Sequence, residues 1–118
     1  MEMITVEMMR VFRLQADLCK TLADANRLMI LYELEDGERS VGRLAAGLGL
    51  SQSNVSRHLA VLREQGVVNT CRDGTTIYYR LSDPKITQAC TIMREILEGR
   101  LARSHLLSFN MKIKKDNG

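Results

Sequence analysis

Apolar positions recur at helical spacing in five separate stretches of the chain, which alternate with short polar or glycine-containing segments. The pattern predicts helices over about residues 3–22, 25–35, 41–47, 51–65 and 84–103. The first of them is apolar over more than one face, and the last carries a long apolar stripe of almost heptad spacing. Because such helices need a second packing partner beside their own core, we expect a homodimer held together through the first and last helices.

Two short runs of β-branched and aromatic residues, VVNTCR and TTIYYRL, follow the fourth predicted helix. The dipeptide Asp73-Gly74 between them favours a tight turn, so the runs predict an antiparallel hairpin over residues 67–81. A helix, a glycine-containing turn, a capped helix and a hairpin in this order are typical of a winged helix-turn-helix. The predicted fold is therefore mostly α-helical with a small β-hairpin wing, and the helix over 51–65 would be the recognition helix.

This fourth predicted helix displays few charges where it begins. Ser51 precedes it as an N-cap, and its buried stripe would be formed at positions i, i+4 and i+7 by Val55, Leu59 and Leu62. The side chains left outward are mostly short hydrogen-bonding groups, which suit contacts with base edges and phosphates. Because Arg57 can pair bidentately with a guanine or bind a phosphate, we expect the helix to lie against DNA. The candidate DNA-binding residues are Ser51, Gln52, Ser53, Asn54, Ser56, Arg57 and His58 of this helix and Arg72 and Thr75 of the wing.

The chain of 118 residues is long enough for one domain, which we expect over residues 1–108, followed by a basic tail over 109–118. Its net charge of +3 is a weak argument for nucleic acid, but residues 51–80 hold four arginines against two acidic residues. If each protomer of a dimer made about four phosphate contacts, log affinity would fall with log salt concentration at a slope of about −7. No long apolar run begins the chain, so we expect a cytoplasmic protein without a membrane partner.

Three segments, LADANRLMILYEL, LAAGLGLSQSNVSRHLAVLREQGVV and RDGTTIYYRLSDP, together closely resemble the ArsR/SmtB family of small transcriptional repressors, and the resemblance covers roughly residues 12–100. It implies a winged-helix homodimer that binds an inverted-repeat operator and is released when a chemical inducer binds. It also maps the family's recognition helix onto Ser51–Gln65 and its wing onto Arg72–Tyr78. The expected partners are thus double-stranded operator DNA and a second copy of the chain.

The residues that bind metals in other members of the family are missing here. Ser40 and Gly42 stand where the metal- and arsenite-binding members carry two cysteines. Other members bind zinc, nickel or cobalt between the last helices, beginning with an aspartate that Asp83 matches, but Lys85 stands where their histidine would be. One carboxylate cannot hold a transition metal, so neither metal site is expected.

Three cysteines, Cys19, Cys71 and Cys90, remain as candidates for a sensing site. Their odd number and wide spacing do not describe a disulfide scaffold, so we expect thiols. One interpretation is that the thiols sense a persulfide or an oxidant, or bind a metalloid or soft metal ion, and the resemblance places Cys19 and Cys90 on the two dimerisation helices. Members that sense persulfide or oxidants use two cysteines at positions that other residues occupy here. The other interpretation is that Cys19 and Cys90 pack as small apolar side chains.

Two alternatives stand beside a thiol-regulated repressor. In one, the repressor responds to an organic ligand or has no direct inducer. In the other, which belongs to a different functional class, the winged helix docks a protein partner and binds no DNA. The sequence shows no nucleophile with a nearby base, no phosphate loop and no complete metal cluster, so we expect no enzymatic activity.

Overall fold

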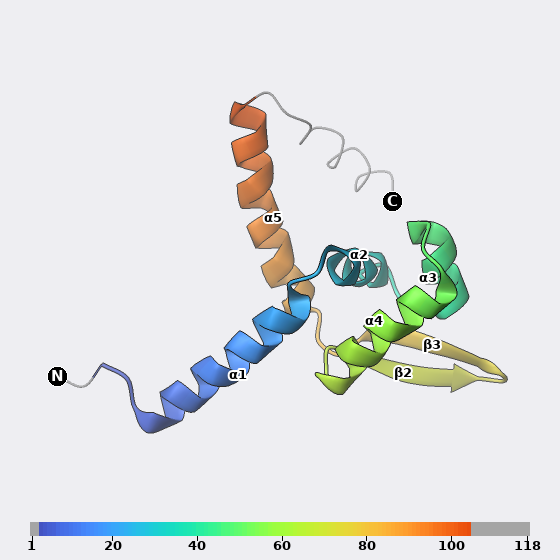
Figure 1. Ribbon diagram of the computed structural model, residues 1–118, viewed down its shortest axis with the longest axis horizontal. Coiled ribbons are helices and arrows are strands. Elements are labelled where there is room, and N and C mark those ends of the chain that lie inside the picture. Colours follow the sequence, from blue (N-terminus) through green and yellow to red (C-terminus); the bar gives the residue numbers. More distant parts are fainter. Residues whose placement is uncertain (1–2, 105–118) are drawn as a thin grey trace. The chain divides into compact units, whose positions relative to one another are not determined.

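The computed structural model describes residues 3–104, which form five helices and three strands (Figure 1). In chain order the elements are α1 Val6–Leu22, α2 Ala25–Leu34, β1 Arg39–Ser40, α3 Val41–Leu48, α4 Gln52–Glu64, β2 Val68–Asp73, β3 Thr76–Leu81 and α5 Lys85–Arg103. The described residues form two units, one that ends at Pro84 and one that begins at Lys85. The expected domain end at 108 and the expected tail over 109–118 lie outside the described residues. No described helix is long and apolar enough to cross a membrane.

The hydrophobic core of the first unit lies between α2, α3, α4 and the start of β2, which gather together in Figure 1. The predicted inward stripe of α4 is confirmed, since Val55, Leu59 and Leu62 are all fully buried. The other buried apolar side chains are Ile30, Leu31, Leu34, Leu44, Ala45, Val67 and Val68. Burying this aliphatic surface fixes α4 by its inner face and leaves its outer face to solvent.

Side-chain caps set where the helices begin. The predicted N-cap Ser51 is confirmed, because its hydroxyl oxygen accepts a hydrogen bond from the backbone N–H of Asn54. Ser40 caps α3 in the same way by accepting from the backbone N–H of Arg43. The prediction that the first helix begins at residue 3 is wrong: Thr5 caps α1 by accepting from the backbone N–H of Met8, so the helix begins at Val6. Met3 and Ile4 continue the hydrophobic pattern but not the helix.

Asp24 caps α2 through its carboxylate. Oδ1 accepts from the backbone N–H of Asn26 at 2.9 Å and of Arg27 at 3.2 Å. The hydrogen bond from the Arg27 backbone does most to hold the pKa of Asp24 below its ordinary value of 3.8, outweighing the opposing effect of desolvation. A carboxylate with a lowered pKa in the folded state stabilises the fold above its unfolded-state pKa, and this stabilisation is lost as the pH falls through the lowered value.

We therefore predict a pH-dependent difference between the wild type and Asp24→Asn. Asparagine also caps helices through its oxygen but carries no charge, so the variant should unfold at a lower urea concentration at pH 7. The two urea midpoints should converge as the pH is lowered through the range in which Asp24 takes up its proton. A difference that stayed constant from neutral to acidic pH would contradict this role for the charge.

The predicted hairpin is confirmed, and one further strand joins it. β2 and β3 pair in antiparallel register from Val68 opposite Leu81 to Asp73 opposite Thr76, and Gly74 takes a positive φ of 64° in the turn. β1 pairs with the other edge of β3, which gives a three-stranded sheet in the order β1-β3-β2. The sequence did not predict β1, because two residues are too few to show an alternating pattern.

Candidate nucleic-acid interface

The start of α4 presents a row of polar side chains outside the core. Ser51, Gln52, Ser53, Ser56 and Arg57 are exposed, and Asn54 is half-buried. The Ser51 hydroxyl is used twice, because it caps the helix and lies 3.3 Å from the Ser53 hydroxyl. The exposed face therefore offers hydroxyl and amide groups close to the helix backbone, a combination that can approach the floor of the major groove.

Arg57 is positioned by its own helix. Its Nη2 donates a hydrogen bond of 2.7 Å to Oδ1 of Asn54, one turn earlier on the same face. This contact uses one of the five N–H donors of the guanidinium, so the others can form a bidentate pair with a guanine or a phosphate. Asn54 thus holds the planar group in front of the helix start and reduces the side-chain entropy that binding would cost.

The expectation that His58 contacts DNA is not supported by its position, since its side chain is only 6% exposed. Its Nδ1 accepts a hydrogen bond of 3.2 Å from Nε of Arg27. Nη1 of the same arginine donates to the backbone oxygen of Thr21, at the end of α1. His58 therefore anchors the inner side of α4. Helical spacing already places position 58 beside Val55 and Leu62, so the sequence pattern indicated that His58 lies on the buried face of α4.

Arg27 is a structural residue that the sequence reasoning missed. Its guanidinium links the end of α1 to α4 across α2, the helix on which it lies. No local pattern could reveal this role, because its partner His58 lies 31 positions further along the chain. The orientation of the candidate reading helix thus depends on polar contacts as well as on the apolar stripe.

The wing places Arg72 and Thr75 at an exposed tip. Arg72 lies near the end of β2 opposite Ile77, and Thr75 follows Gly74 in the turn. A second exposed arginine, Arg80, pairs with Asn69. Because side chains alternate along a strand, Arg72 and Arg80 lie on opposite faces of the hairpin. A DNA groove that receives the tip would therefore contact Arg72 and Thr75, whereas Arg80 lies further from the turn and on the opposite face of the hairpin.

The three candidate thiols are distributed over separate elements. Cys19 on α1 and Cys71 on β2 are exposed, and Cys90 on α5 is half-buried; none of them forms a disulfide. Within residues 3–104, no three histidine, cysteine, aspartate or glutamate side chains gather into a possible metal site. Cys19 and Cys90 belong to different units of the structure, so their proximity in a dimer remains a prediction.

The chain is similar in sequence to known regulatory proteins. The family described as "Bacterial regulatory protein, arsR family" matches residues 24–70, from the cap of α2 into β2. The HTH-type transcriptional regulator Rv0081 of Mycobacterium tuberculosis, named as uncharacterised, is 40% identical over 88 residues, which are 74% of this chain and 77% of that protein.

Two solved structures are similar over most of the chain. The transcriptional repressor BigR from Xylella fastidiosa superposes with a TM-score of 0.69 at 38% identity, covering 80% of this chain and 96% of that one. The homodimeric winged helix-turn-helix DNA-binding domain of Mb0332 from Mycobacterium bovis gives a TM-score of 0.75 at 27% identity, covering 87% and 95%. With its capped helix α4, its hairpin wing and these relatives, the chain belongs to the ArsR family of winged helix-turn-helix transcriptional regulators.

Proposed function

We propose that the protein is a homodimeric repressor that binds an inverted-repeat operator with α4 in the major groove and the hairpin wing beside it. The observation that carries this proposal is the outer face of α4, where Arg57 is held by Asn54 in front of an otherwise uncharged, hydroxyl-rich helix start. A helix that served only as a surface element would show alternating charges there. BigR, a relative of known structure, is itself named as a repressor.

In this proposal the residues of the interface divide into two roles. Gln52 and Arg57 have the long amide and guanidinium groups that read base edges, with Gln suited to adenine and Arg to guanine. The hydroxyls of Ser51, Ser53 and Ser56 are short and suit phosphate contacts that set the register of the helix. Arg72 and Thr75 would contact the backbone or the minor groove beside the half-site.

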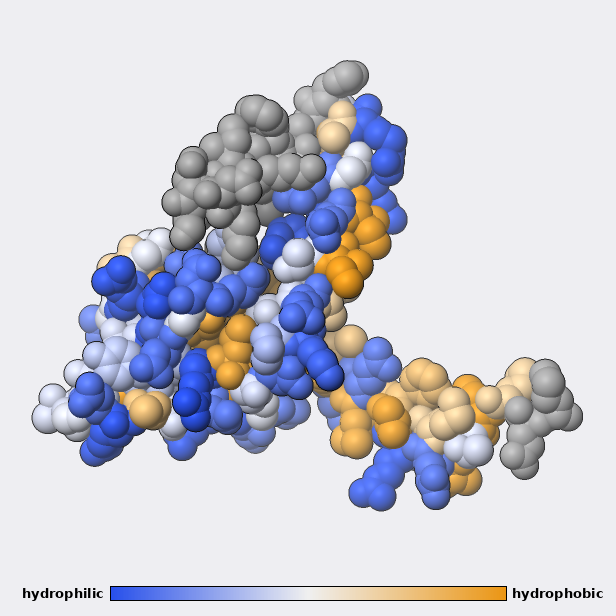
Figure 2. All heavy atoms as spheres, turned by 180° about the vertical axis from the view of Figure 1, so that it is seen from behind, coloured by the Kyte–Doolittle hydropathy of each residue, from blue (hydrophilic) through white to orange (hydrophobic). Residues whose placement is uncertain are grey.

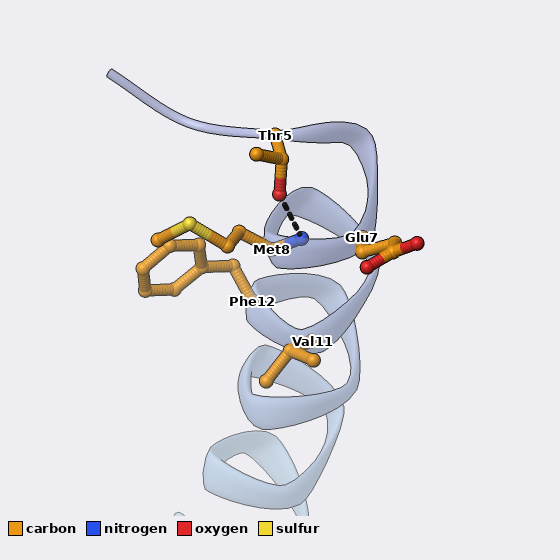
Figure 3. Close-up of a pocket in the computed structure, with 5 residues that line it drawn as sticks. All are labelled: Thr5, Glu7, Met8, Val11 and Phe12. Carbon is orange, nitrogen blue, oxygen red and sulfur yellow. Dashed lines mark hydrogen bonds between the residues drawn. The ribbon is translucent and has the colours of Figure 1, made fainter. Parts of the chain in front are cut away.

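Exposed apolar side chains on two helices support a dimer. Figure 2 shows apolar residues gathered on the surface of α1 and, separately, on that of α5. On α1, Met8, Val11 and Phe12 point to the same side of the helix around a shallow hollow (Figure 3). The exposed apolar residues of α5 are Ile92, Met93, Ile96 and Leu97. Such contiguous apolar faces are typical of protein interfaces, and the Mb0332 domain is described as homodimeric.

The test is a selection of duplexes from a random-sequence library with the purified protein, followed by fluorescence anisotropy at several salt concentrations. We expect enrichment of an inverted repeat and a log-log salt slope near −7, the value for about four phosphate contacts per protomer. The selected site placed over a reporter promoter should lower transcription. Weak binding without sequence preference or salt dependence would instead favour a winged helix that docks a protein.

We propose no catalytic activity for this protein. We also propose that it acts in the cytoplasm, because its partner is chromosomal DNA.

We further propose that the inducer acts through thiols on the dimerisation helices. Cys19 is exposed on α1 and Cys90 lies on α5, so a bond between them or an ion held by them would change the geometry that spaces the two α4 helices. Cys71 on the wing is a second exposed thiol, and an arsenite ion would need all three cysteines.

This proposal predicts that diamide, polysulfide or arsenite releases the reduced protein from the selected duplex. Cys19→Ser or Cys90→Ser should abolish the release without changing binding in reducing buffer. Cys71→Ser serves as the comparison for diamide and polysulfide, and it should abolish the release by arsenite, which would need all three thiols. Retention of DNA by the wild type under every reagent would contradict thiol control. The search would then turn to an organic ligand or to a repressor without a direct inducer.

A further inference from the structure

A second basic site lies beside the start of α3, outside the residues assigned to base reading. A hollow of about 350 Å³ opens there, and it is lined by Glu38, Arg39, Ser40, Arg43 and Tyr78. The pairing of β1 with β3 builds it, because Ser40 lies opposite Tyr78 and α3 begins at the next residue. Arg43 then follows in the first turn of α3, so two arginines separated by only three residues line one concave surface.

The charge in this hollow favours an anion. Two guanidinium groups face one carboxylate, that of Glu38, which leaves a net charge of +1. Nη1 of Arg39 donates to the backbone oxygen of Glu38 at 2.9 Å, and this contact uses one of its five N–H donors. Within residues 3–104, no hydrogen bond or ion pair holds the guanidinium of Arg43. The positive end of the α3 dipole adds to the attraction for an anion.

The hollow adjoins the start of α4. A β-carbon placed on Gly42, between Ser40 and Arg43, would lie 3.5 Å from Nε2 of Gln52. The first turn of α3 therefore lies close to a side chain that we assign to base reading. A duplex whose major groove receives Gln52 carries its sugar-phosphate backbone along the edge of that groove, which brings a phosphate close to the first turn of α3.

We propose that the hollow formed by Arg39, Ser40, Arg43 and Tyr78 binds one backbone phosphate of the operator per protomer, outside the bases that α4 reads. This inference rests on the proposed function and adds a non-reading contact to it. The arginines supply charge-assisted hydrogen bonds, and the Tyr78 hydroxyl supplies a neutral donor. Such a contact positions the protein on the duplex and contributes affinity that is independent of base sequence.

The experiment compares Arg39→Ala, Arg43→Ala and the double variant with the wild type on the selected duplex and on a scrambled one. Loss of one phosphate contact per protomer should reduce the magnitude of the salt slope of the dimer by about 1.8. A fourfold rise in salt would then cost the double variant about 12-fold less affinity than the wild type. Affinity should fall equally for both duplexes, so that the specificity ratio stays unchanged. Glu38→Gln removes the opposing charge and should tighten binding to both.

Arg63→Ala is the matched control, because it removes the same charge from an exposed position near the end of α4 and should leave the salt slope unchanged. Thermal melting checks that each variant is folded. An unchanged slope and affinity in the folded double variant, while the wild type binds specifically, would overturn this inference and leave the proposed function intact. Failure of the wild type to bind any duplex would overturn both. If the variants instead lost stabilisation by inorganic phosphate but kept their DNA affinity, the hollow would be a site for a free anion and the operator contact would be wrong.

Discussion

Replacing Arg57 with alanine is expected to weaken binding to the selected operator by about 2–6 kcal/mol for the dimer, because each of two half-sites loses a bidentate contact worth about 1–3 kcal/mol. The loss should be much smaller on a scrambled duplex, so the specificity ratio should collapse toward one. Arg57 is exposed, and within residues 3–104 its side chain forms a hydrogen bond only with Asn54 on its own helix, so the fold should not suffer. Anisotropy titrations on both duplexes measure the effect.

Arg57→Lys separates charge from shape in the same assay. Lysine keeps the positive charge but not the planar fork, so it should retain most of the salt slope while losing most of the discrimination between duplexes. Gln52→Ala should relax the preference at one base position of each half-site. If Arg57→Ala left the selected site bound as tightly as before, α4 would not be the reading helix.

Placing a glutamate on an apolar dimerisation face is expected to produce monomers and to remove high-affinity operator binding. Phe12 on α1 is 51% exposed and Ile96 on α5 is 54% exposed, so neither side chain is needed to fill the core of its own protomer. In a two-fold interface, Phe12→Glu or Ile96→Glu introduces two carboxylates into apolar surface, where they are costly. A monomer holds one half-site only, and the loss of linked binding should cost about 10²- to 10⁴-fold in affinity.

Sedimentation velocity measures the oligomeric state, and circular dichroism confirms that the helices persist. Met29→Glu is the matched control, since Met29 is a similarly exposed apolar residue on α2 and lies outside the proposed dimer helices. It should remain dimeric and bind the operator. Variants at Phe12 and Ile96 that stayed dimeric would show that α1 and α5 do not form the interface.

Hydrophobic periodicity and local capping chemistry were sufficient to predict most of the fold. The inward stripe of α4, the cap Ser51 and the turn at Gly74 each depend on residues close in sequence, so a single chain reveals them. β1 shows the limit of this reasoning. A strand of two residues forms only because β3 offers a free edge. The two residues alone contain no pattern that predicts a strand.

The location of the candidate interface could be predicted from the sequence, but not all of the residues that form it. The outer face of α4 follows from the same periodicity as its inner face, and Arg57 and Gln52 are exposed as expected. The position of His58 beside Arg57 in the family motif favours a DNA contact, although its helical spacing from Val55 and Leu62 places it on the buried face of α4. Arg27 and the hollow around Arg43 depend on contacts between separate elements, which no local pattern contains.

The spacing between the two half-sites tests the central claim most directly. If two α4 helices related by a two-fold axis read successive major grooves, their half-sites lie about one helical turn apart, or about 10–10.5 base pairs centre to centre. Inserting about five base pairs between the half-sites rotates one of them to the opposite side of the duplex. We predict that this insertion reduces the affinity of the dimer to that of a single half-site and that a full-turn insertion partly restores binding. Equal affinity for every spacing would contradict a rigid dimer that reads an inverted repeat through α4.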